Sequence, residues 1–160
     1  MAITNRGNAY LALKQYRRAI ADYDRAIKLE PNEAIPLNNR GDAYYQIGEG
    51  DRAMDDFNAA IKLDPNYVDA LNNRGLAYVG RGAYDLAIKD FDQVLKLNPN
   101  DADAIRNRAD ALAKKGKLLR RRVRQRLADS CGLGNVALFV VRVAIADSER
   151  KSLFATRLFA

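Results

Sequence analysis

The chain of 160 residues contains no histidine and no tryptophan, and Cys131 is its only cysteine. Histidine is the usual general base and the commonest ligand of transition metals, so its absence counts against both roles. One cysteine can form neither an intrachain disulfide nor a cysteine metal cluster. We therefore expect a protein that is not an enzyme, with no cofactor and no metal, and we interpret Cys131 as a small, half-buried residue.

The sequence also lacks a long hydrophobic run. No apolar segment approaches the roughly 20 residues that are needed to span a bilayer. The first residues show no apolar secretory leader. An intracellular, cytoplasmic location is therefore expected.

A repeated string dominates what is present. Asn-Arg-Gly begins at Asn5, Asn39 and Asn73, and in altered form at Asn107, so each copy follows the last by 34 residues. Other positions recur with the same period: Tyr10, Tyr44 and Tyr78; Ala19, Ala53 and Ala87; Tyr23, Phe57 and Phe91; Ala26, Ala60 and Val94; Pro31, Pro65 and Pro99. A fixed period of this length predicts a stack of similar supersecondary units.

Each unit is predicted to be a helical hairpin. Apolar residues between the repeated positions have helical spacing, and each recurring proline stands where a second helix must end. Gly41 and Ala53 carry almost no side chain, so two helices can approach closely there. Tyr44 and Phe57 would fill the space beside them.

This pattern resembles the tetratricopeptide repeat family, whose 34-residue unit carries a small residue, Tyr, Ala, an aromatic residue, Ala and Pro at these positions. The resemblance implies an all-α fold, a right-handed solenoid of helix-turn-helix hairpins. It also implies a non-catalytic scaffold that binds a partner protein or an extended peptide in a concave groove. The repeats are expected at residues 1–33, 34–67 and 68–101, with a partial fourth from residue 102.

The domain organisation follows from where the repeats stop. We expect the solenoid to occupy residues 1–116. Residues 117–160 are expected to form a basic capping helix and a divergent C-terminal extension. The abrupt loss of register also fits a shifted reading frame in a longer repeat gene.

The resemblance places the first helix of each hairpin along the groove. The residues expected on that wall are mostly amides and carboxylates: Asn5, Asn8, Asn38, Asn39, Asp42, Tyr45, Asp69, Asn72, Asn73, Asp103, Arg106 and Asn107. Asparagine recurs there at positions 5, 39, 73 and 107, and a carboxamide can pair with a peptide backbone whatever its side chains are. This row resembles the asparagine ladder of O-linked N-acetylglucosamine transferases. Alternatively, each asparagine hydrogen-bonds within its own hairpin.

A second binding mode of the family is the carboxylate clamp, which holds the acidic C-terminus of chaperones. The clamp needs two amides with lysines and an arginine on the same wall. Asn8 and Asn39 match its amides, but Thr4, Asp69 and Asn73 stand at its cationic positions. We therefore expect a neutral or basic peptide as the partner and reject a chaperone tail.

Each repeated arginine is accompanied by a recurring aspartate: Arg6 by Asp22, Arg40 by Asp56, and Arg74 by Asp90. We interpret these as ion pairs between the two helices of a hairpin rather than as ligand or catalytic sites. Exposed pairs of this kind contribute only about 0–1 kcal/mol each. The fourth arginine, Arg108, has Arg124 at the corresponding position.

The positive charge is concentrated near the C-terminus. Residues 1–113 carry a net charge of −2 and residues 114–160 a net charge of +9, so the tail accounts for the whole excess of +7. Eight cations open this tail: Lys114, Lys115, Lys117, Arg120, Arg121, Arg122, Arg124 and Arg126. They are interpreted as the polar face of a capping helix, or alternatively as a docking surface for nucleic acid or an anionic membrane. Self-association is a third possibility, through exposed hairpin ends or the apolar run at 136–146.

Overall fold

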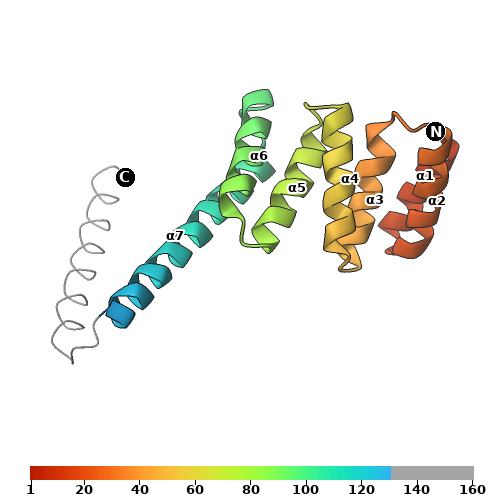
Figure 1. Cartoon of the computed structure of the whole chain (residues 1–160). Coiled ribbons are helices and arrows are strands. Elements are labelled where there is room, and N and C mark those ends of the chain that lie inside the picture. The colour runs from red at the N-terminus through yellow and green to blue at the C-terminus, as the bar shows by residue number, and fades with distance from the viewer. Residues whose placement is uncertain (131–160) are drawn as a thin grey trace. The chain divides into compact units, whose positions relative to one another are not determined.

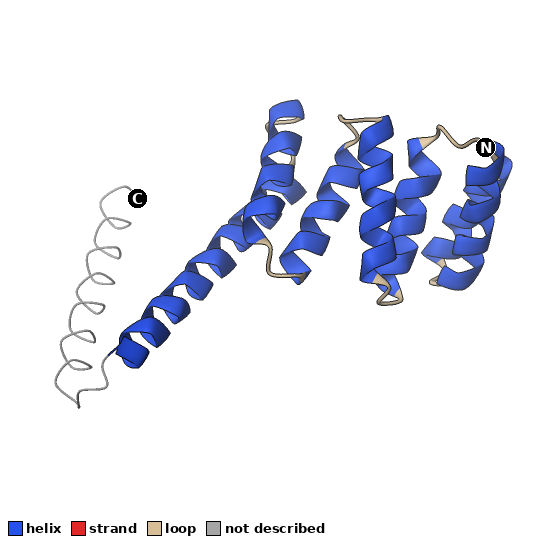
Figure 2. Cartoon of the chain, viewed as in Figure 1, coloured by secondary structure: helices blue, strands red, loops and turns tan. Residues whose placement is uncertain are grey.

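The computed structural model describes residues 1–130, and residues 131–160 are outside this description. The helices are α1 (Ala2–Ala12), α2 (Tyr16–Leu29), α3 (Ala34–Gln46), α4 (Gly50–Leu63), α5 (Val68–Gly80), α6 (Tyr84–Leu97) and α7 (Ala102–Ser130) (Figures 1 and 2). No strand occurs among residues 1–130. The chain divides into two compact units, Met1–Lys115 and Gly116–Ala160. The predictions for Cys131 and the run at 136–146 lie outside the described residues.

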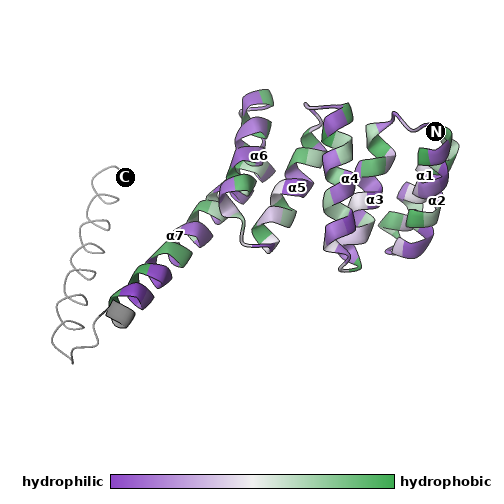
Figure 3. Ribbon diagram, in the orientation of Figure 1, coloured by the Kyte–Doolittle hydropathy of each residue, from purple (hydrophilic) through white to green (hydrophobic). Residues whose placement is uncertain are grey.

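The first unit contains three helical hairpins, as the period predicts. α1 packs on α2, α3 on α4, and α5 on α6, while α2 meets α3 and α4 meets α5 between hairpins. α3 also contacts both α1 and α5, whereas α2, α4 and α6 make no comparable contact with one another within this unit. The odd-numbered helices therefore lie on the inner side of the stack. Every helix of the unit carries both hydrophobic and hydrophilic residues (Figure 3), because each buries only part of its circumference.

The turn inside each hairpin depends on one residue in the left-handed region. Lys14, Gly48 and Gly82 have φ values of 57°, 84° and 73°, and they stand 34 residues apart. The next backbone N–H donates back to the carbonyl of the recurring tyrosine, as in Glu49 to Tyr44 at 2.9 Å. This is the Schellman arrangement that ends many helices, and it favours glycine.

The core of each hairpin is built on a contact between a glycine and an aromatic ring. A Cβ atom placed on Gly41 would lie 2.7 Å from a ring carbon of Phe57 and 3.2 Å from a backbone oxygen of the opposite helix. Gly7 and Gly75 face Tyr23 and Phe91 in the same way, at 2.7 and 2.6 Å. These rings are fully or almost fully buried, so the predicted close approach of the helices is confirmed.

α7 begins a fourth repeat, which packs on the end of the third hairpin. The Asp101 carboxylate accepts a hydrogen bond from the backbone N–H of Ala104 at 2.8 Å, which caps the start of the helix. Ala104 packs with Val94, and Ala111 packs with Phe91. One side of α7 thus completes the core of the third hairpin.

The fourth repeat has no hairpin turn within the described residues. Gly116 stands in the register of Gly48 and Gly82, yet α7 passes through it without a break. The residues that would form a second helix in this register therefore continue α7 instead.

The Gly41→Ala variant should lower the free energy of unfolding by about 1–3 kcal/mol, because the added methyl overpacks the contact with Phe57. Urea unfolding of the full chain measures this change. Gly50→Ala is the matched control, since its Cβ would meet nothing closer than an Arg81 guanidinium nitrogen at 3.7 Å. If Gly41→Ala is no less stable than Gly50→Ala, close helix approach is not what this glycine provides.

The Lys14→Gly variant should raise the free energy of unfolding by about 1 kcal/mol, because it relieves a left-handed conformation at a non-glycine residue. Gly48→Lys is the reciprocal variant and should lower it by a similar amount. A side chain at Gly48 would meet nothing within 4 Å, so the difference reports the backbone alone. Shifts of the same sign in the two variants would contradict this explanation.

Candidate functional site

The predicted binding residues lie on the inner face, defined here as the surface formed by α1, α3, α5 and residues 102–115 of α7. Asn38 is buried, at 3% exposure. The exposed members are Asn5, Asn8, Tyr45, Asp69, Asp103 and Arg106, and the half-buried members are Asn39, Asp42, Asn72, Asn73 and Asn107. The inner face therefore presents amides and carboxylates together.

Four asparagines of this face form one hydrogen-bonded series, here called the amide chain. Asn73 Nδ2 donates to Asn38 Oδ1 at 3.0 Å, and Asn38 Nδ2 donates to Asn39 Oδ1 at 3.0 Å. Asn39 Nδ2 then donates to Asn8 Oδ1 at 2.9 Å. The chain thus links α5, α3 and α1, and all its bonds point the same way.

Asn8 is the end of the amide chain. Its Oδ1 also accepts a hydrogen bond from the Tyr23 hydroxyl at 2.8 Å, so both lone pairs of this oxygen are engaged. Burial raises the pKa of Tyr23 to about 12, so the hydroxyl keeps its proton at neutral pH. Asn8 therefore offers an incoming group its two N–H donors rather than its oxygen.

The amide chain differs from the predicted ladder of asparagines spaced by 34. Asn39 and Asn73 take part in it, whereas Asn5 and Asn107 do not. The bonds between helices instead join residues 31 and 35 apart, which bring in Asn8 and Asn38. Asn72 contributes a different feature, because its buried Oδ1 has no hydrogen-bond partner in the described part of the chain.

The carboxylates of the inner face are largely held by neighbours on the same helix. Asp42 accepts a hydrogen bond from Gln46 at 3.0 Å, and Asp103 pairs with Arg106 at 2.7 Å. Asp69 is exposed, and lies in the first turn of α5, where the helix dipole favours a negative charge. The acidic character of the inner face is therefore partly structural.

On the other side of the odd-numbered helices, the predicted ion pairs between helices are confirmed. Arg6 Nε and Nη2 bind Asp22 at 2.7 and 2.6 Å. Arg40 makes the same bidentate contact with Asp56, at 2.8 and 2.6 Å. Arg74 and Asp90 repeat the geometry at 2.8 and 2.7 Å.

The expectation that these pairs are exposed is wrong for their carboxylates, although the Arg6 side chain is 53% exposed. Asp22, Asp56 and Asp90 are only 5%, 5% and 4% exposed. The recurring alanine and aromatic residue on the same helix pack between the two helices of the hairpin. The adjacent aspartate is therefore buried at their interface. A buried carboxylate depends on its partner far more than a surface one does.

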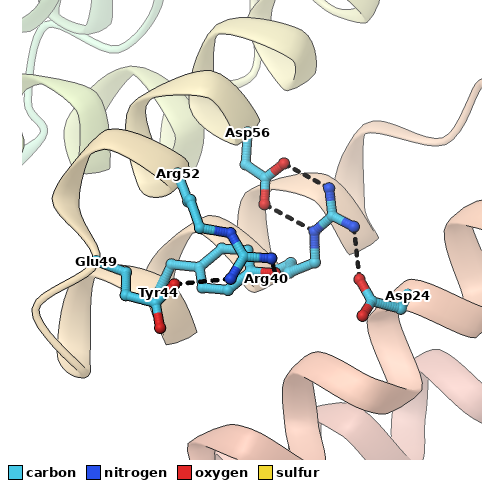
Figure 4. A network of polar contacts seen from close by, with 6 residues as sticks. All are labelled: Asp24, Arg40, Tyr44, Glu49, Arg52 and Asp56. Atoms are coloured by element: carbon cyan, nitrogen blue, oxygen red, sulfur yellow. Dashed lines mark hydrogen bonds and ion pairs between the residues drawn. The ribbon is translucent and has the colours of Figure 1, made fainter.

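A second set of bonds joins neighbouring hairpins through the same arginines, and we call both sets together the arginine ladder. Arg40 Nη1 donates to Asp24 of the preceding hairpin at 2.6 Å (Figure 4). Arg74 Nη1 donates to Asn58 in the same way at 2.9 Å. The acceptor lies 16 residues before the arginine in each case, a spacing that the sequence interpretation overlooked.

Aromatic contacts support the arginine ladder at its centre. The Arg52 guanidinium lies 4.0 Å from the ring centroid of Tyr44, and Arg52 also pairs with Glu49 (Figure 4). Hydrogen bonding to Asp56 raises the pKa of Arg40, and burial raises the pKa of Tyr44. These contacts hold α3 against α4.

The predicted anion-binding cations divide between two environments. Lys114 pairs with Asp110 at 2.7 Å, and Lys115 pairs with Asp85. The remaining six cations, between residues 117 and 126, are exposed along α7. Docking on nucleic acid or an anionic membrane stays a prediction for these six. None of the helices in residues 1–130 has the length and apolar character of a membrane span.

Comparison with known proteins identifies the repeat. A family model described as tetratricopeptide repeat matches residues 4–68, and a second with the same description matches residues 68–101. The second tetratricopeptide repeat (TPR) domain of human RPAP3 is 33% identical to this chain, with 68% of this chain and 91% of that domain covered. The chain belongs to the tetratricopeptide repeat family. Its fold is thereby confirmed as an all-α solenoid of TPR hairpins.

Solved TPR structures resemble the chain closely. The RPAP3 domain gives a TM-score of 0.64 and is in complex with the HSP70 peptide SGPTIEEVD. The first TPR of Spaghetti (RPAP3), bound to the HSP90 peptide SRMEEVD, is 28% identical over 70% of this chain and 89% of that one, with a TM-score of 0.68. The Sgt2 TPR domain from Aspergillus fumigatus is 28% identical over 74% and 80%, with a TM-score of 0.70. Curated protein sequences give no match.

These comparisons support a protein-interaction module, and the family and its neighbours are non-catalytic. Within residues 1–130 no three acidic or cysteine side chains are arranged to hold a metal ion.

The expectation of a neutral or basic partner, with chaperone tails rejected, is wrong. Two of the similar structures hold the chaperone peptides SRMEEVD and SGPTIEEVD, both of which end in acidic residues. Thr4, Asp69 and Asn73 do lack the charge of the clamp's cations. The uncharged N–H donors of Asn8 and Asn39, which match the clamp's amides, also stabilise a carboxylate.

Stability should depend on acid through the pair of Arg6 and Asp22. The hydrogen bond from Arg6 lowers the pKa of Asp22 in the folded chain. Above the ordinary aspartate pKa of about 4, the pair contributes fully. As the pH falls below that value the unfolded chain takes up the proton first, so the free energy of unfolding decreases until the pH has passed the lower pKa of the folded state.

Urea unfolding between pH 6 and pH 2 checks this expectation. Asp22→Asn should flatten the decrease in the free energy of unfolding on the acid side. Asp55→Asn, at an exposed aspartate of α4, is the control and should keep the slope of the parent chain. Equal slopes for the two variants would show that the pair of Arg6 and Asp22 is not responsible.

Proposed function

We propose that the chain binds an extended peptide with an acidic C-terminal end on its inner face, with Asn8 and Asn39 at the centre of the site. The observation that carries this proposal is the direction of the amide chain. Its bonds run from Asn73 through Asn38 and Asn39 to Asn8, where two N–H donors are left for a ligand. An acceptor such as a carboxylate matches that end.

The direction of the chain strengthens the donor at its end. In a series of hydrogen-bonded amides each bond polarises the next, so the terminal N–H becomes a better donor. The Tyr23 hydroxyl adds to this effect by donating to the same Asn8 oxygen. Asn8 thus combines exposure with an oxygen that is already saturated, which favours an anionic ligand.

The relatives point to the same ligand class. The TPR structures of Spaghetti and human RPAP3 hold peptides that end in EEVD. Asn8 and Asn39 occupy the amide positions of the carboxylate clamp, while Thr4, Asp69 and Asn73 replace its cations. Recognition by uncharged donors should therefore be weaker than recognition by a cationic clamp, and less sensitive to salt.

The rest of the inner face suits an extended backbone. Asn5, Asn73 and Asn107 recur along it, so polar side chains that can pair with a peptide backbone follow the whole face. The exposed Asp69 would repel a long acidic tract, so the acidic part of the ligand should be short.

Fluorescence anisotropy with labelled SRMEEVD and the full chain tests the proposal. Asn8→Ala should weaken binding about tenfold or more, because a hydrogen bond to a charged group is lost. Asp69→Lys should strengthen binding by removing a repulsive charge and adding an attractive one. Asp55→Lys makes the same charge change on α4, away from the inner face, and should have much less effect.

The matched peptide control carries a C-terminal amide in place of the carboxylate and should bind more weakly. Failure of SRMEEVD to bind, or equal binding by the parent chain and Asn8→Ala, would overturn the proposal.

A further inference from the structure

Within residues 1–130, the fourth hairpin of the stack has no second helix. In the third hairpin, Leu71 and Gly75 of α5 are buried beneath α6. The equivalent residues of α7, 34 positions later, are Ile105 and Ala109, and both are exposed. Leu112 continues this face one turn further. Ile105 is 50% and Leu112 is 44% exposed, so within residues 1–130 α7 presents a half-exposed apolar strip.

The arginine ladder is incomplete at the same place. Arg40 and Arg74 each use three guanidinium nitrogens, two of them on the buried aspartate that follows. Arg108 donates only from Nε, to Asp92 of the preceding hairpin. Neither of its terminal nitrogens has a hydrogen bond within the described residues. The Arg108 side chain is 41% exposed, against 20% and 19% for Arg40 and Arg74.

The residues of this chain that match the second helix of a hairpin do not supply a carboxylate for Arg108. The position that matches Asp56 and Asp90 holds Arg124, which has the same charge as Arg108. Residues up to Ser130 continue α7 instead of turning back at Gly116. An apolar strip and an arginine whose two terminal nitrogens make no hydrogen bond within residues 1–130 therefore lie side by side on α7.

We propose that a helix of a partner protein completes the fourth hairpin by docking on Ile105, Ala109 and Leu112 and giving a carboxylate to Arg108. By helical periodicity this strip lies on a different side of α7 from Asp103 and Asn107, so the inference is independent of the peptide proposal. The partner helix takes the place that α4 and α6 hold in their hairpins. Its acidic residue binds the terminal guanidinium nitrogens of Arg108, and its apolar residues cover the strip.

The second helices of the chain itself define the chemistry of the partner. α6 presents Ala87, Asp90, Phe91 and Val94 to α5, and the small and aromatic residues pack while the aspartate binds Arg74. Ala109 carries a methyl group at the position where the third hairpin has Gly75. A Cβ on Gly75 would lie 2.6 Å from the Phe91 ring. The residue after the partner's aspartate is therefore aliphatic rather than aromatic.

A peptide copied from α6 tests the surface directly. The probe has the sequence of residues 84–97 with leucine in place of Phe91, and a lactam between the exposed positions 85 and 89 keeps it helical. Binding to the full chain is measured by fluorescence anisotropy. The matched control peptide carries asparagine in place of Asp90 and should bind at least about tenfold more weakly.

Variants of the chain assign the contacts. Arg108→Gln should remove the preference for the aspartate peptide, and Leu112→Asp should abolish binding of both peptides. Lys62→Gln removes an exposed cation of α4 and should change nothing. Unlabelled SRMEEVD should not compete with the probe.

Three results would overturn the proposal. One is equal binding of the aspartate and asparagine peptides to the parent chain, and another is no binding of either. The third is a parent chain that is dimeric by light scattering and becomes monomeric in Leu112→Asp, because the strip would then hold a second copy.

Discussion

Close contact between the two helices of each hairpin is the constraint on which the rest of the structure depends. The glycines of the Asn-Arg-Gly strings leave no room for a methyl group against the aromatic ring opposite, and this sets the distance between the helices. At that distance an arginine next to the glycine reaches the aspartate next to the ring. The distances between residues on the inner face, including those of the amide chain, depend on the same contact.

The features that lie within one repeat could be predicted from the sequence. The hairpins, the close approach of two helices at Gly41 and the ion pair of Arg40 with Asp56 all follow from residues that recur at a fixed offset. Their burial could not be predicted in the same way. An aspartate looks alike in a sequence whether it faces water or a helix seam, and only the packed neighbours decide which.

The features that cross between repeats were harder to predict. The bond of Asn39 to Asn8 and that of Arg40 to Asp24 depend on how one hairpin is rotated against the next. That rotation is set by packing. The acceptors of the arginines do recur at an offset of 16 residues, whereas the amide bonds between helices join residues 31 and 35 apart and share no single period. The ligand class was misjudged for a related reason, because a count of charges says nothing about which way a row of hydrogen-bonded amides points.

The arginine ladder has a consequence for how the solenoid unfolds. In a one-dimensional stack, stability is a sum of the terms within units and the terms between neighbours. Arg40 belongs to both kinds at once, since one side chain closes its own hairpin and holds the preceding one. Opening one hairpin therefore weakens the next, which favours cooperative melting of the stack over fraying from its ends. Within residues 1–130 Arg108 closes no hairpin of its own, so α7 is joined to the stack by fewer bonds of this kind than α3 and α5 are.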